Sequence, residues 1–213
     1  MASTVVPISP PLDLTSGYVA HRGLREELAR LTVATRGVNP ADIRQRQAVE
    51  TQLALVLRFL DAHHREEHTL VYPRVRARFP VAGRVFTALE VDHDSLAALT
   101  RRAANTQVPL RDRAVAVGRL HDLVARHTYH EESAVFPLMR RHVSNLEQRA
   151  LLRRTLRRWG RDMPAFVALY LHHADRDERR CLLRLVPPGA GFLWRLSWRR
   201  RYARRRAAAY GRA

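Results

Sequence analysis

The chain of 213 residues contains no lysine, so all 38 of its basic residues other than histidine are arginine. With only 20 acidic residues, the formal net charge is +18. A charge of this size favours non-specific attraction to nucleic acid or to an anionic membrane, but it identifies neither as a partner. No sequence-reading nucleic-acid module is recognisable in the chain. The net charge therefore characterises the protein surface and does not identify a function.

Cysteine is almost absent, since Cys181 is the only one. A single thiol excludes an intramolecular disulfide and gives no support to an oxidising compartment. We expect Cys181 to be an inert core residue rather than a redox sensor. The chain also lacks a basic start followed by an apolar core, and it has no run approaching ~18 apolar residues. We therefore expect neither a secretion signal nor a spanning helix, and the default location is a reducing cytoplasm.

Strand-like alternation is missing as well, although 46% of the residues are hydrophobic, which excludes a disordered chain. Apolar residues instead recur at helical spacing. The predicted helices span about 14–35, 41–73, 84–104 and 109–141, joined by short polar links. These helices predict an all-α fold, an antiparallel up-down four-helix bundle with additional C-terminal helices.

Helix start and stop signals support these boundaries. Gly37 is a plausible end for the first helix, and Asn39 followed by Pro40 is a typical start for the second. Pro73 should kink or end the second helix, because proline cannot donate to the preceding turn. Pro109 opens the fourth.

The predicted organisation has three parts. Residues 1–12 form an irregular N-terminal arm, residues 13–143 the bundle, and residues 144–213 a C-terminal helical extension. Within the extension, Ser144 and Glu147 form a capping box for a helix to about Trp159. Asp162 can cap a further helix from Met163 to about Leu185, which ends before Pro187, Pro188 and Gly189.

The tail, residues 190–213, is rich in arginine and carries aromatic residues at Trp194, Trp198 and Tyr202. Spacing of four places the three aromatic rings on one face of a helix. One interpretation is an amphipathic helix that packs these rings against the bundle with its arginines outward. The other is a weak contact with anionic lipid or nucleic acid through residues 190–213.

The strongest signal is a repeated motif. HHREEHTLVYP at 63–73 and HTYHEESAVFP at 127–137 share a histidine, a glutamate four residues later and an aromatic-proline pair, all displaced by 64 residues. Side chains four apart lie on one face of a helix. His63 with Glu67, and His127 with Glu131, can therefore each point at one spot between helices.

Each predicted bundle helix carries one histidine of this set. The candidate metal ligands are His21, His63, Glu67, His93, His127 and Glu131. Imidazole with carboxylate suits iron, manganese or zinc. If both glutamates bridge two six-coordinate ions, about four of about twelve positions stay open, which predicts a reactive centre rather than a closed structural one.

Other polar residues near the motif compete for these roles. His64, His68 and His130 lack an equivalent in the other copy, so we interpret them as groups that surround the ligands or face solvent. Asp94 and Glu132, each beside a candidate ligand, are interpreted as solvated residues or partners of the ligands.

Two tyrosines have candidate catalytic roles. Tyr18, one turn before His21, and Tyr72 could hydrogen-bond to a ligand bound at the metal. The alternative for each is an ordinary core tyrosine.

The order His, HxxxE, His, HxxxE, with the (Y/F)-P continuation, resembles the hemerythrin-like family of HHE cation-binding domains, in particular its bacterial single-domain branch. The resemblance covers about residues 14–142. It implies an up-down bundle around a non-haem di-iron centre with an oxo or hydroxo bridge, in which manganese or zinc could substitute. His21, His63, His93 and His127 would be the terminal nitrogen ligands, and Glu67 and Glu131 the bridging carboxylates.

The chain departs from the invertebrate oxygen carriers of that family. Position 89 is leucine where they have a histidine, and position 132 is glutamate where they have an aspartate. The first change removes one nitrogen ligand and sets the chain apart from simple oxygen carriers.

The resemblance implies binding of, or reaction with, O2, H2O2 or NO, including catalase-like turnover, with electrons from a donor. One alternative is a di-iron oxygenase or oxidase for an organic substrate, with the extension forming part of a pocket. Another is a non-catalytic iron or oxygen sensor that acts through the basic tail.

Overall fold

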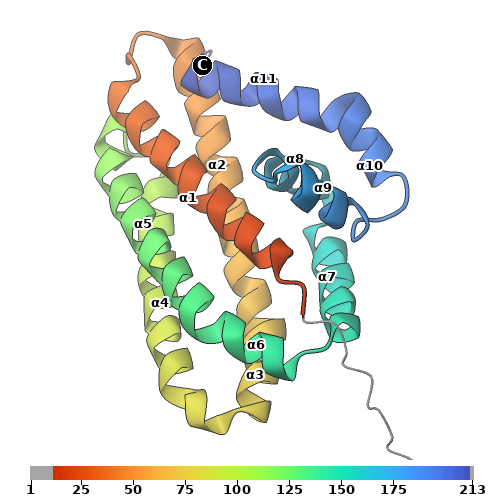
Figure 1. The fold of residues 1–213 in the computed structure, drawn as a ribbon. Coiled ribbons are helices and arrows are strands. Elements are labelled where there is room, and N and C mark those ends of the chain that lie inside the picture. Colours follow the sequence, from red (N-terminus) through yellow and green to blue (C-terminus); the bar gives the residue numbers. More distant parts are fainter. Residues whose placement is uncertain (1–11, 212–213) are drawn as a thin grey trace, which may run out of the picture.

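The structure, a computed structural model, describes residues 12–211, which form helices and no strands. Four long helices make an antiparallel up-down bundle (Figure 1). They are α1 (Thr15–Gly37), α2 (Ile43–Glu66), α4 (Gly83–Ala104) and α5 (Leu110–His130). The predicted fold class is confirmed. The predicted N-terminal arm lies outside the described residues except for Leu12, which is buried.

Both helices that carry the repeated motif continue through their prolines. After α2 the chain forms a π-helical turn, η1 (Glu67–Val71), and then α3 (Tyr72–Arg78). After α5 it forms η3 (Glu131–Val135) and then α6 (Phe136–His142). Each proline thus lies in the first turn of a new helix, where a backbone N–H has no partner within the helix, so the missing N–H costs no hydrogen bond. The kink expected at Pro73 is a π-bulge, and both bulges begin at a motif glutamate.

Two predicted boundaries of the bundle helices are confirmed and one is wrong. Gly37 is the last residue of α1, and Pro109 is the N-cap of α5. The second helix begins at Ile43 rather than near Asn39, because the side chain of Asp42 accepts from the Gln45 N–H. The short 3-10 turn η2 (Pro80–Ala82) connects α3 to α4.

The extension begins as predicted with α7 (Asn145–Trp159), whose capping box pairs Ser144 with Glu147. The turn η4 (Gly160–Asp162) follows. Asp162 makes no capping hydrogen bond. Its carboxylate instead lies 3.2 Å from the guanidinium of Arg58 on α2, so the predicted cap is wrong.

The single helix predicted for 163–185 is also wrong, because it is broken in two. The pieces are α8 (Met163–His172) and α9 (Arg176–Leu183). Asp175 and Glu178 form a reciprocal capping box that starts α9. This Asp-x-x-Glu spacing was the signal for the break.

The tail folds as α10 (Ala190–Leu193), the π-turn η5 (Trp194–Trp198) and α11 (Arg199–Tyr210), which crosses α2 and α8 (Figure 1). Trp194 and Tyr202 are buried in the core, and Trp198 is half-buried against it. The packing expected for the aromatic rings is therefore confirmed, although Arg206 turns inward to Glu27 rather than outward. Contact of this segment with anionic lipid or nucleic acid stays a prediction.

Cys181 is half-buried on α9 rather than in the core. Its sulfur lies 2.8 Å from the carboxylate of Asp13. Burial, together with this neighbouring carboxylate, raises the pKa of the Cys181 thiol to about 11. The thiol is thus kept protonated and poorly nucleophilic, although its expected position was wrong.

No helix of the described chain combines the length and apolar character that a membrane crossing requires.

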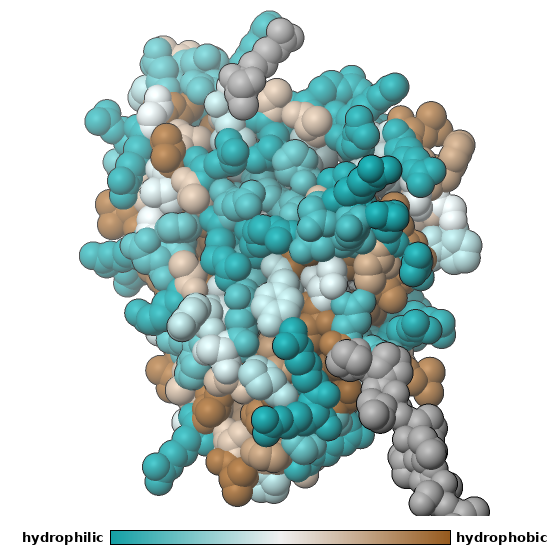
Figure 2. Space-filling view, viewed as in Figure 1, coloured by the Kyte–Doolittle hydropathy of each residue, from teal (hydrophilic) through white to brown (hydrophobic). Residues whose placement is uncertain are grey.

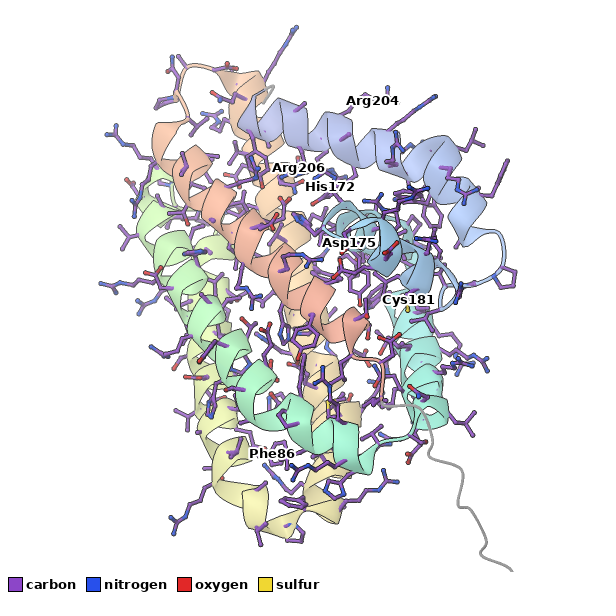
Figure 3. The ribbon with its side chains drawn as sticks, viewed as in Figure 1. Phe86, His172, Asp175, Cys181, Arg204 and Arg206 are labelled. Carbon is purple, nitrogen blue, oxygen red and sulfur yellow. The ribbon has the colours of Figure 1, made fainter. Side chains whose placement is uncertain are left out.

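A buried carboxylate joins the extension to the bundle. Glu27 of α1 is fully buried and accepts hydrogen bonds from Gln52 at 2.8 Å, Arg206 at 2.7 Å and Tyr210 at 2.6 Å. His173, which follows α8, lies 3.0 Å away. Figure 3 shows Arg206 reaching from α11 toward α1 and α8. Because the partners come from three elements, Glu27 holds α11 and α8 on the bundle.

The first prediction concerns acid stability. Burial alone would raise the pKa of Glu27, but hydrogen bonds from His173 and Tyr210 and the charge of Arg206 outweigh it and lower the pKa from 4.5 to about 2. The carboxylate therefore contributes ~3 kcal/mol to the free energy of unfolding above pH ~4.5, which is lost as the pH falls toward 2. Denaturant unfolding from pH 6 to pH 3 should show a smaller loss of stability in Glu27→Gln than in the wild type. Asp122→Asn, the control at an exposed carboxylate, should lose as much stability as the wild type. If Glu27→Gln also loses as much stability as the wild type, Glu27 does not contribute to acid sensitivity.

Candidate metal centre

The six predicted ligands converge inside the bundle. They are His21 of α1, His63 of α2, Glu67 of η1, His93 of α4, His127 of α5 and Glu131 of η3. All except the half-buried His63 are buried. Each comes from the inward face of its helix, and the two glutamates project from the start of the π-turns.

These side chains form two overlapping groups, each able to hold an ion. The first group is His21, His63, Glu67 and Glu131, and the second is His64, Glu67, His93 and His127. Within each group the ligand atoms lie within 4.8 Å of one another. Glu67 belongs to both groups, so the two ion positions are neighbours.

Distances between ligand atoms fit ions of the expected size. In the second group, the Nε2 atoms of His93 and His127 are 2.9 Å apart. In the first group, His63 Nε2 lies 3.0 Å from Glu67 Oε1, and His21 Nε2 lies 3.4 Å from Glu131 Oε2. Ligands ~2.1 Å from one ion are themselves spaced by roughly 3 Å. The Nε2 of His127 is also 3.5 Å from Glu131, so this second carboxylate reaches toward both positions.

Several of the converging atoms are buried without a hydrogen-bond partner in the described chain. They are the Nε2 atoms of His21, His63 and His64 and the Oε2 atoms of Glu67 and Glu131. Buried polar atoms are normally paired. A cation in each group would satisfy these atoms, so the residues fit a metal.

The pKa values of the clustered side chains also fit a metal site. Burial raises the pKa of Glu67 to about 8, and burial together with the charge of Glu67 raises that of Glu131 to about 8. Burial also lowers the pKa of His93 to about 2 and of His127 to about 3, with neighbouring histidines adding to the effect. The imidazoles are therefore neutral, as metal ligands must be. Two adjacent carboxylates in such a site need a positive charge, which a divalent ion supplies.

Further residues orient the ligands. Glu132 lies 2.9 Å from His21 Nδ1 and also accepts from Arg25, so it leaves His21 Nε2 facing the cluster. The carboxylate of Asp92 lies 3.5 Å from His127 Nδ1. A partner such as Glu132 fixes the tautomer of a ligating histidine, whereas Asp92 is near His127 Nδ1 without a hydrogen bond. Glu132 and Asp94 were expected to be solvated residues or partners of the ligands; Glu132 is a partner, Asp94 is exposed, and the approach of Asp92 was not expected.

The sequence interpretation of His64 was wrong in one respect. The absence of a counterpart in the second copy, where Thr128 stands, argued against it, yet the structure places His64 in the second group. Its spacing of three from Glu67, on the same helix face, was the available signal. His64 therefore offers a nitrogen that Leu89, buried among apolar residues, does not. His68 lies outside both groups, with its Nε2 2.6 Å from His93 Nδ1, and His130 also belongs to neither group.

The two tyrosines differ in position. The hydroxyl of Tyr72 donates to Glu131 Oε1 at 2.5 Å, and its ring stacks on His93 with centroids 5.7 Å apart. The ring of Tyr18 instead packs edge-on against Phe136, with centroids 4.9 Å apart. Only Tyr72 is therefore placed against a candidate ligand.

The second prediction follows from the partner of His21. Glu132→Gln should lower metal affinity at the first position roughly 10–100-fold, because His21 loses the charged group that orients it. Competition with a coloured chelator measures this affinity. Asp94→Asn, at an exposed position, is the matched control, and equal affinities in both variants would remove the orienting role.

The family model of the hemerythrin HHE cation-binding domain matches residues 18–139. That region covers more than half of the 213 residues and includes every residue of both groups. Searches of curated proteins and of solved structures each found no match to the chain. On the strength of the family match, the chain belongs to the hemerythrin family of HHE cation-binding proteins.

Proposed function

We propose that the chain holds two iron ions side by side and uses them to bind or react with O2, H2O2 or NO in a reducing cytoplasm. The observation that carries this proposal is the pair of ligand groups that share Glu67. A bound iron pair would supply electrons to such a ligand, or accept them from it.

The ligand groups differ in a way that suits this chemistry. The second group has three imidazoles, His64, His93 and His127, whereas the first has only His21 and His63. Each group supplies four residues, so the first position has fewer imidazoles but the same number of protein ligands, and a six-coordinate ion there would keep room for an exogenous ligand. The residues of the first group also line a cavity, so a small molecule can approach the first position from the cavity.

The chain's own residues control the electrostatics of the centre. Glu67 and Glu131 bring two negative charges to a position shielded from water, which favours a highly charged cation pair. The Tyr72 hydroxyl donates to Glu131 and holds one of its oxygens. Phe136 stacks on His21, with centroids 5.3 Å apart, and covers that imidazole with an apolar ring.

The third prediction tests the shared carboxylate. Glu67→Gln should lower bound iron from about two ions per chain to less than one, since Glu67 belongs to both groups. Glu66→Gln is the matched control, because Glu66 is the preceding buried carboxylate and belongs to neither group. Metal analysis of aerobically purified proteins measures the ratio. Full iron content in Glu67→Gln would refute the shared position.

The fourth prediction separates the two positions. His93→Ala and His21→Ala should each retain about one ion per chain, because each removes a ligand from one group only. His121→Ala, outside both groups on α5, should retain about two. Loss of both ions in either single variant would show that the positions are not independent.

The reaction itself is tested on the iron-loaded protein. A bridged ferric pair gives an absorption band near the ultraviolet edge. Rapid oxygen evolution from H2O2 would support peroxide turnover, and a reversible spectral change on removing O2 or adding NO would support binding. If none of these changes occurs in a protein that holds two irons, the proposed function is wrong.

A further inference from the structure

A cavity of about 160 Å³ lies between the bundle and the C-terminal extension. Its lining includes His21, His63, Glu67 and Glu131, the complete first group of candidate ligands. The three histidines of the second group do not line it. The cavity therefore meets the centre from one side, at the position that has two imidazoles rather than three.

The opposite wall of the cavity is built by the extension. Leu152, Leu156 and Trp159 of α7, together with Leu171 of α8 and Leu182 of α9, line it. Gln148 is the only buried residue of α7, while Leu152, Leu156 and Trp159 are half-buried. Because α7 packs most closely on α8 and η4 rather than on the bundle, its apolar face is left turned toward the cavity. Figure 1 shows α7, α8 and α9 beside the bundle, and Figure 2 shows brown, apolar residues interrupting the polar surface in this region.

Apolar walls and size limit what the cavity can take. A dry cavity of roughly 150 Å³ lined by aliphatic and aromatic residues is large enough to bind benzene. Apart from the candidate ligands, two lining residues have a buried polar atom without a partner in the described chain, Gln148 Oε1 and Trp159 Nε1. Gln148 Oε1 can accept from a hydroxyl, and Trp159 Nε1 can donate to a hydroxyl or carbonyl, so either atom can pair with a polar group on an otherwise apolar molecule.

We infer that this cavity binds a small, mainly apolar organic molecule of about benzene size with one hydroxyl or carbonyl group. The bound molecule lies with one side against the His21 and His63 position. Binding depends on the cavity walls alone, whereas delivery of the molecule to a metal rests on the proposed function. The organic molecule would bind in addition to the small oxygen or nitrogen species of the proposed function.

Benzyl alcohol is the probe, titrated into the full-length, zinc-loaded protein, which is diamagnetic. Nuclear magnetic resonance should show saturable binding and intermolecular Overhauser effects to the methyl groups of Leu152 and Leu182. Leu152→Trp fills the cavity and should weaken binding at least tenfold. Leu146→Trp makes the same change on the same helix at a side chain that is 79% exposed, and should leave binding unchanged.

Two results would overturn the inference. One is an absence of saturable binding to the wild type, and the other is binding without Overhauser effects to the cavity methyl groups. Both rest on the wild-type protein, so they hold even if Leu152→Trp fails to fold.

Replacing zinc by iron tests the side that faces the centre. Iron should strongly enhance the relaxation of the bound benzyl alcohol protons, because the first position lines the cavity. Metal content measured on the same samples separates the two ideas. If benzyl alcohol binds in the cavity of a protein that retains no iron, the proposed function is refuted and this inference is supported. If the protein holds two irons and the relaxation of benzyl alcohol is unaltered, the contact between cavity and centre is refuted.

Discussion

The interior of the bundle depends on two carboxylates placed side by side where water is excluded. Glu67 and Glu131 are buried; burial raises the pKa of Glu67 to about 8, and burial together with the charge of Glu67 raises that of Glu131 to about 8. Five neutral imidazoles face them, and these offer lone pairs without positive charge. Such an arrangement is unfavourable for a self-contained core and favourable around a cation. The metal site is thus a consequence of the electrostatics as well as of the ligand spacing.

The backbone solves a geometric problem at the same two residues. A helix that runs past Pro73 or Pro137 loses a hydrogen bond and meets a clash with the preceding turn. The π-turns that begin at Glu67 and Glu131 each accommodate one extra residue. As a result, the backbone N–H of Tyr72 donates to the backbone carbonyl of Glu67, and that of Phe136 donates to the backbone carbonyl of Glu131. π-bulges are rare and occur frequently at functional sites. The repeated aromatic-proline pair therefore helps to aim both carboxylates.

Much of the fold and the core of the site could be predicted because their signals are local and periodic. Helical spacing, the glycine at 37 and the box at Ser144 gave element boundaries, and the repeat gave His63, Glu67, His127 and Glu131. Two errors had local signals, the cap at Asp42 and the capping box at Asp175, whereas the error at Asp162 arose because a tertiary partner decides. Asp162 fits a cap by sequence, yet Arg58 on another helix takes its carboxylate.

His64 and Asp92 were missed for the same reason. The two copies of the motif differ at His64, because Thr128 stands at the equivalent place, and Asp92 lies outside both copies. Only the packing of α2, α4 and α5 shows that His64 turns inward and that Asp92 approaches His127. Similarly, the cavity could not be seen from the sequence, because it results from the way α7 stands off the bundle while Glu27 holds α8 and α11 against it. The extension thus shields one side of the bundle from solvent and at the same time opens an apolar space beside the first ion position. The additional helices thus form one wall of the space beside His21 and His63.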